Sequence, residues 1–149
     1  MALDPEIRRL LPIDRAEVEA IDSEARSGLE GQRGAEAWLA EHRPLVALTD
    51  WSRTWVGTVD EVVVGFLCGT IDEVEGRGRV FTVDRVYVRA QARDLGFGDA
   101  LVAAALRDAE IEGCQFFEAV ALPGDRETKN LYERAGITAR SIVVSRRLG

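Results

Sequence analysis

Residues 88–101 read VRAQARDLGFGDAL, a stretch in which a run of strand-forming residues stops, two glycines follow, and an apolar helical pattern begins. Gly96 and Gly98 allow backbone conformations closed to residues with a Cβ atom, and they let a ligand approach the main chain closely. Unpaired N–H groups at the start of the following helix favour an anion, and Arg93 adds a positive charge beside them. The stretch therefore predicts a pyrophosphate-binding loop, with a tight turn before a helix as the alternative.

The composition indicates one globular domain that spans residues 1–149, with no linker inside it. Hydrophobic residues make up 46% of the chain, enough to bury a core without metal ions or disulfides. The formal net charge of -7 argues against nucleic acid or an anionic membrane as a partner, because phosphate binding requires clustered Lys and Arg. We find no signal peptide, and no apolar segment approaches the roughly 20 residues that span a bilayer.

The two cysteines, Cys68 and Cys114, lie far apart in the sequence and lack the spacing of metal ligands. This usage predicts reduced, mostly buried thiols in a cytoplasmic protein and no metal site. Because His42 is the only histidine that could partner a thiolate, a catalytic cysteine is not expected.

Hydrophobic periodicity predicts helices and strands around a central antiparallel hairpin. Asp14 and Glu17 have the spacing of a capping box at the start of the first helix, with Ile13 placed to pack on Val18. A polar two-residue turn at 60–61 joins two β-branched runs into the hairpin. The expected strands are 7–11, 54–59, 62–71, 79–88, 115–122 and one or two within 137–148, and the expected helices are 14–28, 35–42, 98–113 and 125–135.

The strand at 115–122 is nearly continuous in apolar residues, which favours a strand covered on both faces. It follows a helix that itself follows the strand at 79–88, so the two strands should be parallel and joined by a right-handed crossover. The fold class expected from the residues is therefore α/β, with a mixed sheet.

Three local motifs match one known family in order and in separation. They are Arg93-x-x-Gly96-x-Gly98 after a strand that ends in VYV, the segment LYERAG at 131–136 in the last helix, and VGF at 64–66 in the third strand. With these motifs the sequence resembles the GNAT superfamily of acetyl-CoA-dependent N-acyltransferases, most closely over residues 80 to about 137. A nucleotide-binding oxidoreductase is the weaker alternative, because no third glycine follows and the preceding strands form a hairpin.

The resemblance implies a mixed, mostly antiparallel sheet with a splayed parallel strand pair and about four flanking helices. It implies an N-acetyltransferase that moves the acetyl group of acetyl-CoA to a primary amine by direct attack. The acceptor would be a small molecule, a peptide or protein N-terminus, or a lysine, and a homodimer is suggested. Acetyl-CoA would be held by backbone groups of Val86, Tyr87 and Val88, by the loop Arg93, Asp94, Leu95, Gly96, Phe97, Gly98 and Asp99, and by Asp125.

The resemblance also assigns Tyr132 as the residue that protonates the departing CoA sulfur. For the general base the residues leave three options open, which are Asp84, Glu118 and a relayed water. Asp84 lies in an otherwise apolar run, where burial could raise its pKa, or it could pair with Arg85 or Arg79.

Two carboxylates keep a second class of function open. Asp94 and Asp99 lie in the loop expected to hold a pyrophosphate, so a non-catalytic acyl-CoA-binding or regulatory module is the alternative.

The part of the chain expected to bind the acceptor amine matches the family least. Three tryptophans, Trp38, Trp51 and Trp55, are candidates either for an aromatic acceptor pocket or for the core.

Overall fold

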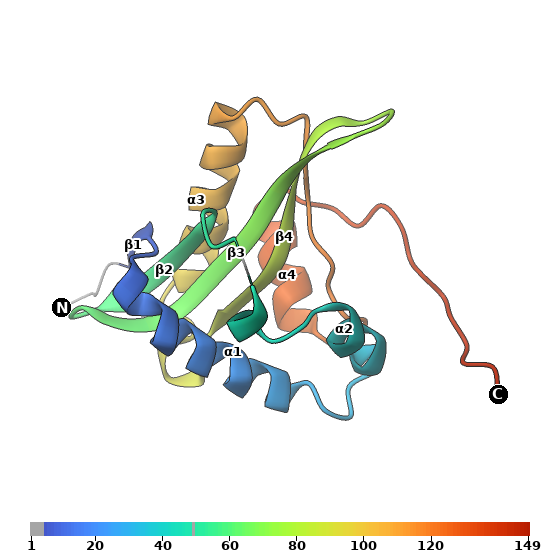
Figure 1. The fold of residues 1–149 in the computed structure, drawn as a ribbon, viewed down its shortest axis with the longest axis horizontal. Coiled ribbons are helices and arrows are strands. Elements are labelled where there is room, and N and C mark those ends of the chain that lie inside the picture. The colour runs from blue at the N-terminus through green and yellow to red at the C-terminus, as the bar shows by residue number, and fades with distance from the viewer. Residues whose placement is uncertain (1–4, 49) are drawn as a thin grey trace.

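The computed structural model describes residues 5–48 and 50–149 and places one five-stranded sheet at the centre of the molecule, in the order β1-β2-β3-β4-β5 (Figure 1). The first four strands are antiparallel neighbours, and β5 is parallel to β4. This confirms the mixed, mostly antiparallel sheet. The strands are β1 (Glu6–Arg9), β2 (Thr54–Val59), β3 (Val62–Val74), β4 (Gly78–Val88) and β5 (Phe116–Glu118).

The hairpin of β2 and β3 is built on the two-residue turn that the sequence predicts. Asp60 and Glu61 both take positive φ angles, 48° and 69°. Two successive residues of this kind form the tight turn whose twist matches the twist of the flanking strands. The sequence also predicts β4 to within one residue, because the expected strand is 79–88 and the observed strand is Gly78–Val88.

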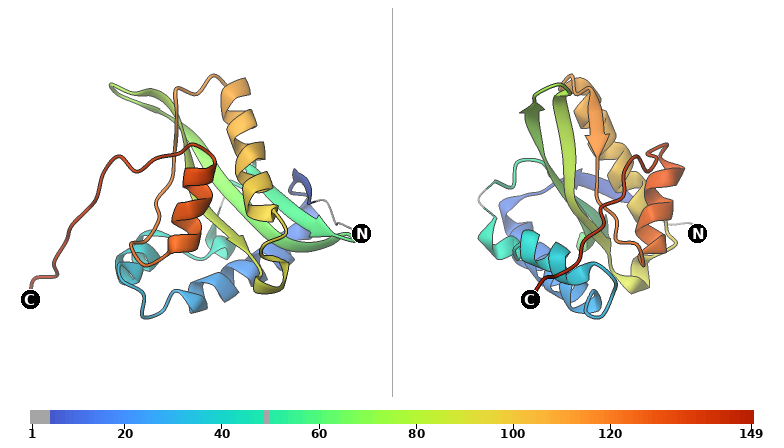
Figure 2. Two further views of the ribbon diagram at one scale, coloured as in Figure 1. Left: turned by 180° about the vertical axis from the view of Figure 1, so that it is seen from behind. Right: turned by 90° about the vertical axis from the view of Figure 1, so that its right-hand side faces the viewer.

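Four α-helices cover the two faces of the sheet, with α3 and α4 on one face and α1 and α2 on the other (Figure 2). Leu101, Val102 and Ala105 of α3 pack on Leu67 and Phe81 of the sheet. The helices are α1 (Arg15–Gly28), α2 (Ala35–Glu41), α3 (Phe97–Ile111) and α4 (Arg126–Arg134), with short 3-10 turns η1 (Pro12–Asp14), η2 (Leu45–Ala47) and η3 (Ala90–Ala92).

The opposite face has its own apolar cluster. Val18 and Ile21 of α1 pack with Leu45 of η2 on Val56 and Phe66 of the sheet. β3 and β4 lie between the two helical layers, so both of their faces are buried over part of their length. This explains why their sequences are apolar on both faces there.

A bulge in β4 marks the place where the sheet opens. Cys68 of β3 pairs with Arg85, whereas the next residue of β3 pairs with Val83, so Asp84 is an extra residue in β4. Pairing of β4 with β5 ends at Thr82 and Glu118, just before this bulge. The splayed parallel pair is thus present, and the backbone of β4 beyond the bulge is left without a strand on its β5 side.

Four expectations for individual segments are wrong. Residues 137–149 contain no helix or strand, so the predicted strands within 137–148 are absent, and β5 is shorter than the predicted 115–122. The Asp14 carboxylate does not cap α1, because it accepts hydrogen bonds from Arg8 and from the N–H of Leu11. Ile13 is 85% exposed and so does not pack on Val18.

Within the described part of the chain, no helix is both long enough and apolar enough to cross a membrane.

Candidate active site

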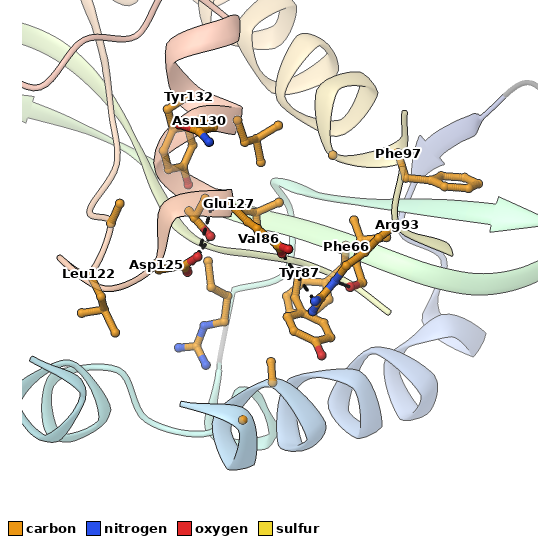
Figure 3. A pocket seen from close by; sticks show the side chains of 18 of the residues that line it. Phe66, Val86, Tyr87, Arg93, Phe97, Leu122, Asp125, Glu127, Asn130 and Tyr132 are labelled. Atoms are coloured by element: carbon orange, nitrogen blue, oxygen red, sulfur yellow. Dashed lines mark hydrogen bonds and ion pairs between the residues drawn. The ribbon is translucent and has the colours of Figure 1, made fainter. Parts of the chain in front are cut away.

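A cavity of about 810 Å³ opens where β4 separates from β5, and α1, α2, the start of α3 and α4 surround it (Figure 3). Most of the residues expected to hold acetyl-CoA or to catalyse transfer line this cavity. Two of the residues considered from the sequence do not, namely Leu95, whose side chain is exposed, and Glu118. The expected residues that line it are Asp84, Val86, Tyr87, Val88, Arg93, Asp94, Gly96, Phe97, Gly98, Asp99, Asp125 and Tyr132.

The two glycines of the loop have different structural roles. Gly96 takes a φ of 86° as the N-cap of α3, and Asp94 before it also has a positive φ of 65°. Gly98 lies in the first turn of α3, where an added Cβ would be 3.2 Å from Leu131 Cδ1, so it lets α4 approach α3 closely. The N–H groups of this first turn have no partners within the helix and lie at the cavity. This geometry fits an anion such as a pyrophosphate.

Backbone groups of Val86–Val88 form another wall of the cavity. On one side, the backbone of Val86–Val88 pairs with residues 65–67 of β3. On the other side, the pairing of β4 with β5 has already ended at Thr82, so the strand edge is open there. An added Cβ at Gly65 would lie 2.9 Å from the carbonyl oxygen of Tyr87, so this glycine permits the close approach of β3 to β4. An extended, amide-bearing chain fits such an edge, because it can satisfy the unpaired backbone groups.

Arg93 links the loop to the end of β4. Its Nε donates a hydrogen bond to the carbonyl oxygen of Val88 at 3.1 Å, and its guanidinium lies 5.3 Å from the ring centre of Tyr87. Glu127 of α4 lies 3.4 Å from its Nη1. The Arg93 cation is therefore held at the rim of the cavity, as Figure 3 shows.

Two aspartates of the expected phosphate site, Asp99 and Asp125, have partners in the protein. Asp99 Oδ1 accepts a hydrogen bond from Arg134 Nε at 3.0 Å. Asp125 is the N-cap of α4, where its Oδ1 accepts from the N–H of Thr128 at 3.1 Å and its Oδ2 accepts from the Thr128 hydroxyl at 2.6 Å. Asp125 therefore stabilises the start of α4, and its carboxylate lies at the cavity wall.

Tyr132 projects from α4 into the cavity, and only 7% of the residue is exposed (Figure 3). Burial raises the pKa of its phenol, and the negative charge of Asp125 adds to this effect. The hydroxyl consequently keeps its proton at neutral pH, as a proton donor must. Burial likewise raises the pKa of Cys68 to about 12, so this thiol is not an activated nucleophile.

A buried ion network lies on the α1 side of the cavity, and sequence reasoning missed the part of it that Asp22 contributes. The side chain of Arg85 is 7% exposed, and it donates from Nε to Asp84 at 2.6 Å and from Nη1 to Asp22 of α1 at 2.9 Å. Asp22 also accepts from the N–H of Leu45 at 3.0 Å, and the ring of Trp38 lies 5.5 Å from the Arg85 guanidinium. The alternative that Asp84 pairs with Arg85 is confirmed.

The two carboxylates of this network stabilise the buried charge of Arg85. Burial alone would lower the pKa of Arg85, but the hydrogen bond to Asp22 and the charge of Asp84 outweigh burial and raise it. Asp22 falls beside Val18 and Ile21 on the buried face of α1. An acidic residue at helical spacing within an apolar face is the signal that could have revealed it.

Glu118 has a different environment. It accepts hydrogen bonds from Arg77 at 2.5 Å and from Arg140 at 2.8 Å, and the bond from Arg77 is the main reason that its pKa lies below the usual value. Its carboxylate therefore connects β5 to neighbouring segments and lies outside the cavity lining.

Of the three tryptophans, only Trp38 lines the cavity, and it stacks on His42 with ring centres 4.3 Å apart. Trp51 and Trp55 are buried in the two core clusters. Across residues 5–48 and 50–149, no group of three or more His, Cys, Asp or Glu side chains is arranged to hold a metal ion.

A mixed sheet that opens at a bulge beside a glycine-rich helix start is an α/β arrangement whose open strand edge and helix N-terminus fit a long, anionic ligand. Comparison with family models is more specific, because the model of the acetyltransferase (GNAT) family matches residues 16–137. The chain belongs to the acetyltransferase (GNAT) family, and the resemblance found in the sequence is confirmed. No curated protein matches the sequence.

Solved structures of this fold resemble the chain over nearly its whole length. The aminoglycoside N-acetyltransferase AAC(6')-Iy with bound CoA is 19% identical, with a TM-score of 0.66, over 96% of this chain and 100% of that chain. A ribosomal-protein-alanine N-acetyltransferase from Brucella melitensis biovar Abortus 2308 is 22% identical, with a TM-score of 0.71, over 97% and 98%. A possible acetyltransferase from Clostridium difficile 630 is 17% identical, with a TM-score of 0.71, over 99% of both chains. At these identities the likeness concerns the fold.

Proposed function

We propose that this chain is an N-acetyltransferase that moves an acetyl group from acetyl-CoA to a primary amine by direct attack. The observation that carries the proposal is the cavity at the splay of β4 and β5, which is lined by the α3 helix start, Tyr132 and Asp84. These parts correspond to the three needs of the reaction, namely an anion site for the cosubstrate, a proton donor and a proton acceptor.

The loop Arg93–Asp99 and the open edge of Val86–Val88 are the proposed acetyl-CoA site. The N–H groups at the start of α3 suit the pyrophosphate, and the free edge of β4 suits the amides of the pantetheine arm. When bound there, acetyl-CoA supplies an activated acetyl group as a thioester. A backbone N–H near Val86 is the proposed donor to the oxygen that becomes negative in the transition state.

Tyr132 is the proposed general acid. Its hydroxyl points into the cavity from α4 and keeps its proton, because burial raises its pKa. A protonated phenol can donate to a departing thiolate at short range. The phenol need not ionise before this step, so a raised pKa is compatible with the role.

Asp84 is the proposed proton acceptor. It lies at the bulge of β4 on the cavity wall, with its side chain 34% exposed, and its Oδ2 accepts a hydrogen bond from Arg85 Nε at 2.6 Å. An ionised carboxylate can attract an ammonium group and take its proton directly or through a water molecule. Glu118, the other carboxylate considered, is bonded to Arg77 and Arg140 away from the cavity.

The acceptor is proposed to be an amine that enters between α1, α2 and α4. Similar structures carry the names of an aminoglycoside acetyltransferase and of a ribosomal-protein-alanine acetyltransferase, and the proposal covers both small-molecule and peptide amines. Among the charged residues that α1, β4 and the α4 region contribute to the cavity lining, four carboxylates outnumber three arginines, which suits a cationic amine; they are Asp22, Asp84, Asp125 and Glu127 against Arg26, Arg85 and Arg134.

One observation favours a second candidate, a non-catalytic acyl-CoA-binding module. Two cations of the cavity lining are already paired with carboxylates, Arg93 with Glu127 and Arg134 with Asp99.

A measurement of turnover separates the two candidates. An acetyltransferase will release free CoA in the presence of an amine panel of aminoglycosides, polyamines and peptides. CoA binding in calorimetry with no release across the panel would favour the module.

Tyr132→Phe tests the assignment of the acid, with Tyr87→Phe as the matched control, since these are the two tyrosines of the chain and both line the cavity. We expect Tyr132→Phe to lower kcat by roughly 10²- to 10⁴-fold, because a general acid contributes that much. The dissociation constant of CoA in calorimetry should change little. Tyr87→Phe should retain most of kcat, and a normal kcat in Tyr132→Phe would remove this residue from the mechanism.

A further inference from the structure

Asp84 is the extra residue at the bulge of β4, and the bulge determines on which side of the sheet its side chain lies. In a regular strand, successive side chains point to opposite faces, so one residue separates two that share a face. Val83 before the bulge and Val86 after it both pack in the apolar cluster on the α3 side. Two residues lie between them, Asp84 and Arg85, so the bulge allows both of these side chains to lie on the α1 side.

A chain of hydrogen bonds connects α1 to Asp84 through Arg85. Arg85 donates from Nη1 to Asp22 of α1 at 2.9 Å and from Nε to Asp84 Oδ2 at 2.6 Å. Asp22 is itself fixed, because it also accepts from the N–H of Leu45 at 3.0 Å. The side chains of Asp22 and Arg85 are 3% and 7% exposed, and that of Asp84 is 34% exposed. The two buried side chains therefore fix the orientation of the accessible one at the cavity wall.

The bond from Arg85 occupies one oxygen of Asp84 and leaves the other for an amine. Among the residues that the structure describes, none donates a hydrogen bond to Oδ1 of Asp84. A proton acceptor needs such an oxygen, held within hydrogen-bond reach of the proton that it takes. The aspartate side chain can rotate about two bonds, and the bond between Oδ2 and Arg85 limits where Oδ1 can point.

A need for stability does not by itself account for a buried ion pair at this place. Taking two charges out of water costs free energy, and apolar side chains of similar volume often stabilise a fold equally well. A carboxylate of comparable burial, Asp108 of α3, also binds two arginines, but it lies outside the cavity lining. Asp22, Arg85 and Asp84, in contrast, all line the cavity. The location of this network therefore points to a role in the reaction.

We propose that Asp22 and Arg85 are positioning residues, which hold the Asp84 carboxylate so that its Oδ1 takes the proton of the acceptor amine. This inference rests on the proposed function, in which Asp84 is the proton acceptor. Asp22 and Arg85 need not touch the amine, because their effect on the rate comes from orientation. A displacement of about 1 Å at a reacting group can lower a rate roughly 100-fold. Since Asp22 belongs to α1, the packing of this helix on the sheet becomes part of the catalytic geometry.

Asp22→Asn in the full chain tests the proposal, with Asp108→Asn as the matched control, since each removes the charge of a buried, arginine-bound carboxylate. The rate is the release of CoA with whichever amine of the panel the wild-type chain acetylates fastest. We expect Asp22→Asn to lower kcat roughly 10- to 100-fold and to change the KM of acetyl-CoA by less than about twofold. Asp108→Asn should also lower the Tm but should keep kcat. An equal loss of kcat in both variants would mean a general effect of stability and would overturn the proposal.

Asp84→Asn separates this inference from the proposed function. If Asp84 takes the proton, Asp84→Asn should lower kcat roughly 10²- to 10⁴-fold. Adding Asp22→Asn to this variant should lower kcat no further, because Asp22 acts through Asp84. A further loss in the double variant, or a normal kcat in Asp22→Asn beside a slow Asp84→Asn, overturns the positioning role and leaves the proposed function standing. A normal kcat in Asp84→Asn overturns both.

A second variant keeps the test open if Asp22→Asn does not fold. The pair Asp22→Leu with Arg85→Met replaces the buried ions by apolar side chains, so the fold should persist while kcat still falls. Its crystal structure, compared with one of the wild-type chain, should show the Asp84 carboxylate displaced. This comparison needs no amine, so it decides the positioning of Asp84 even if no amine of the panel is acetylated and the proposed function fails. A carboxylate that has not moved, or a wild-type kcat, would overturn the positioning role.

Discussion

Asp99 shows how one side chain can set the charge of the proposed phosphate site. Its carboxylate pairs with Arg134 Nε at 3.0 Å and lies in the first turn of α3, where the helix dipole favours a negative group. The aspartate therefore stabilises the free helix start and at the same time occupies a cation that a phosphate could use. Helix stability and ligand binding compete at this residue.

Asp99→Asn should strengthen CoA binding, because it removes a negative charge and releases Arg134. We expect the dissociation constant in calorimetry to fall roughly two- to fivefold, the scale of an exposed ion pair. The gain should shrink at high salt, which screens exposed charges. Asp60→Asn, in the turn of the hairpin, changes the net charge equally and should leave the constant unchanged. An unchanged constant in Asp99→Asn would place Asp99 and Arg134 outside the phosphate contacts.

Local residue patterns located the loop and the tyrosine because each depends on neighbours in sequence. The positive φ of Gly96 and the position of Tyr132 on α4 follow from motifs a few residues long. The pairing of Arg85 with Asp22 could not be found in this way. Asp22 lies 63 residues away on another helix, and only the packing of α1 on the sheet brings the two together.

At the scale of elements, Asp14 joins β1 to α1. Its carboxylate accepts from Arg8 Nη1 at 2.7 Å, from Arg8 Nη2 at 3.0 Å and from the N–H of Leu11 at 2.7 Å. The sequence predicts the start of α1 within one residue, but it assigned the carboxylate to the helix N–H groups. The Arg8 guanidinium competes successfully, because it is a charged donor that binds both carboxylate oxygens, whereas a helix N–H is a single uncharged donor.

Asp14→Asn should lower the free energy of unfolding by about 1–3 kcal/mol near pH 7, since it removes charge-assisted hydrogen bonds of a buried group. The bond from Arg8 lowers the pKa of Asp14 in the folded state, so the carboxylate stabilises the fold fully above its unfolded pKa. This contribution is lost as the pH falls through the lower, folded pKa. The difference between wild type and Asp14→Asn, measured by urea denaturation, should therefore narrow below about pH 4. A difference that stays constant down to pH 2 would contradict this role.

The segment 138–149 shows another limit of prediction from sequence, because strand propensity does not tell whether a strand finds a partner. Its residues have strong strand propensity, and the sequence predicts strands there, yet none forms. A strand exists only when its backbone groups are paired, so propensity alone cannot create one. The same reasoning explains why β5 is limited to Phe116–Glu118, the residues that pair with β4.

For the molecule as a whole, the cavity depends on the two layers of helices and on the opening between β4 and β5. Its walls extend from Asp22 on α1 to Arg134 on α4, and the sheet lies between these helices. The side that resembles the family motifs was predictable, because that side is built from backbone and glycines. The acceptor side depends on side chains of α1, α2 and the loop between them, for which no motif exists.

A ligand that bridges these walls should stabilise the entire fold. If CoA binds only the folded chain, a concentration of 100 times its dissociation constant adds about 2.7 kcal/mol to the free energy of unfolding. For a domain of this size we expect the Tm in calorimetry to rise by roughly 5–10 °C. Adenosine monophosphate at the same concentration should raise it much less, because it lacks both the pyrophosphate and the pantetheine arm. Tyr132→Phe should show nearly the full rise, since its hydroxyl is proposed to act on a proton and not on affinity. A Tm that CoA leaves unchanged would mean that the cavity at the splay of β4 and β5 does not hold the cosubstrate.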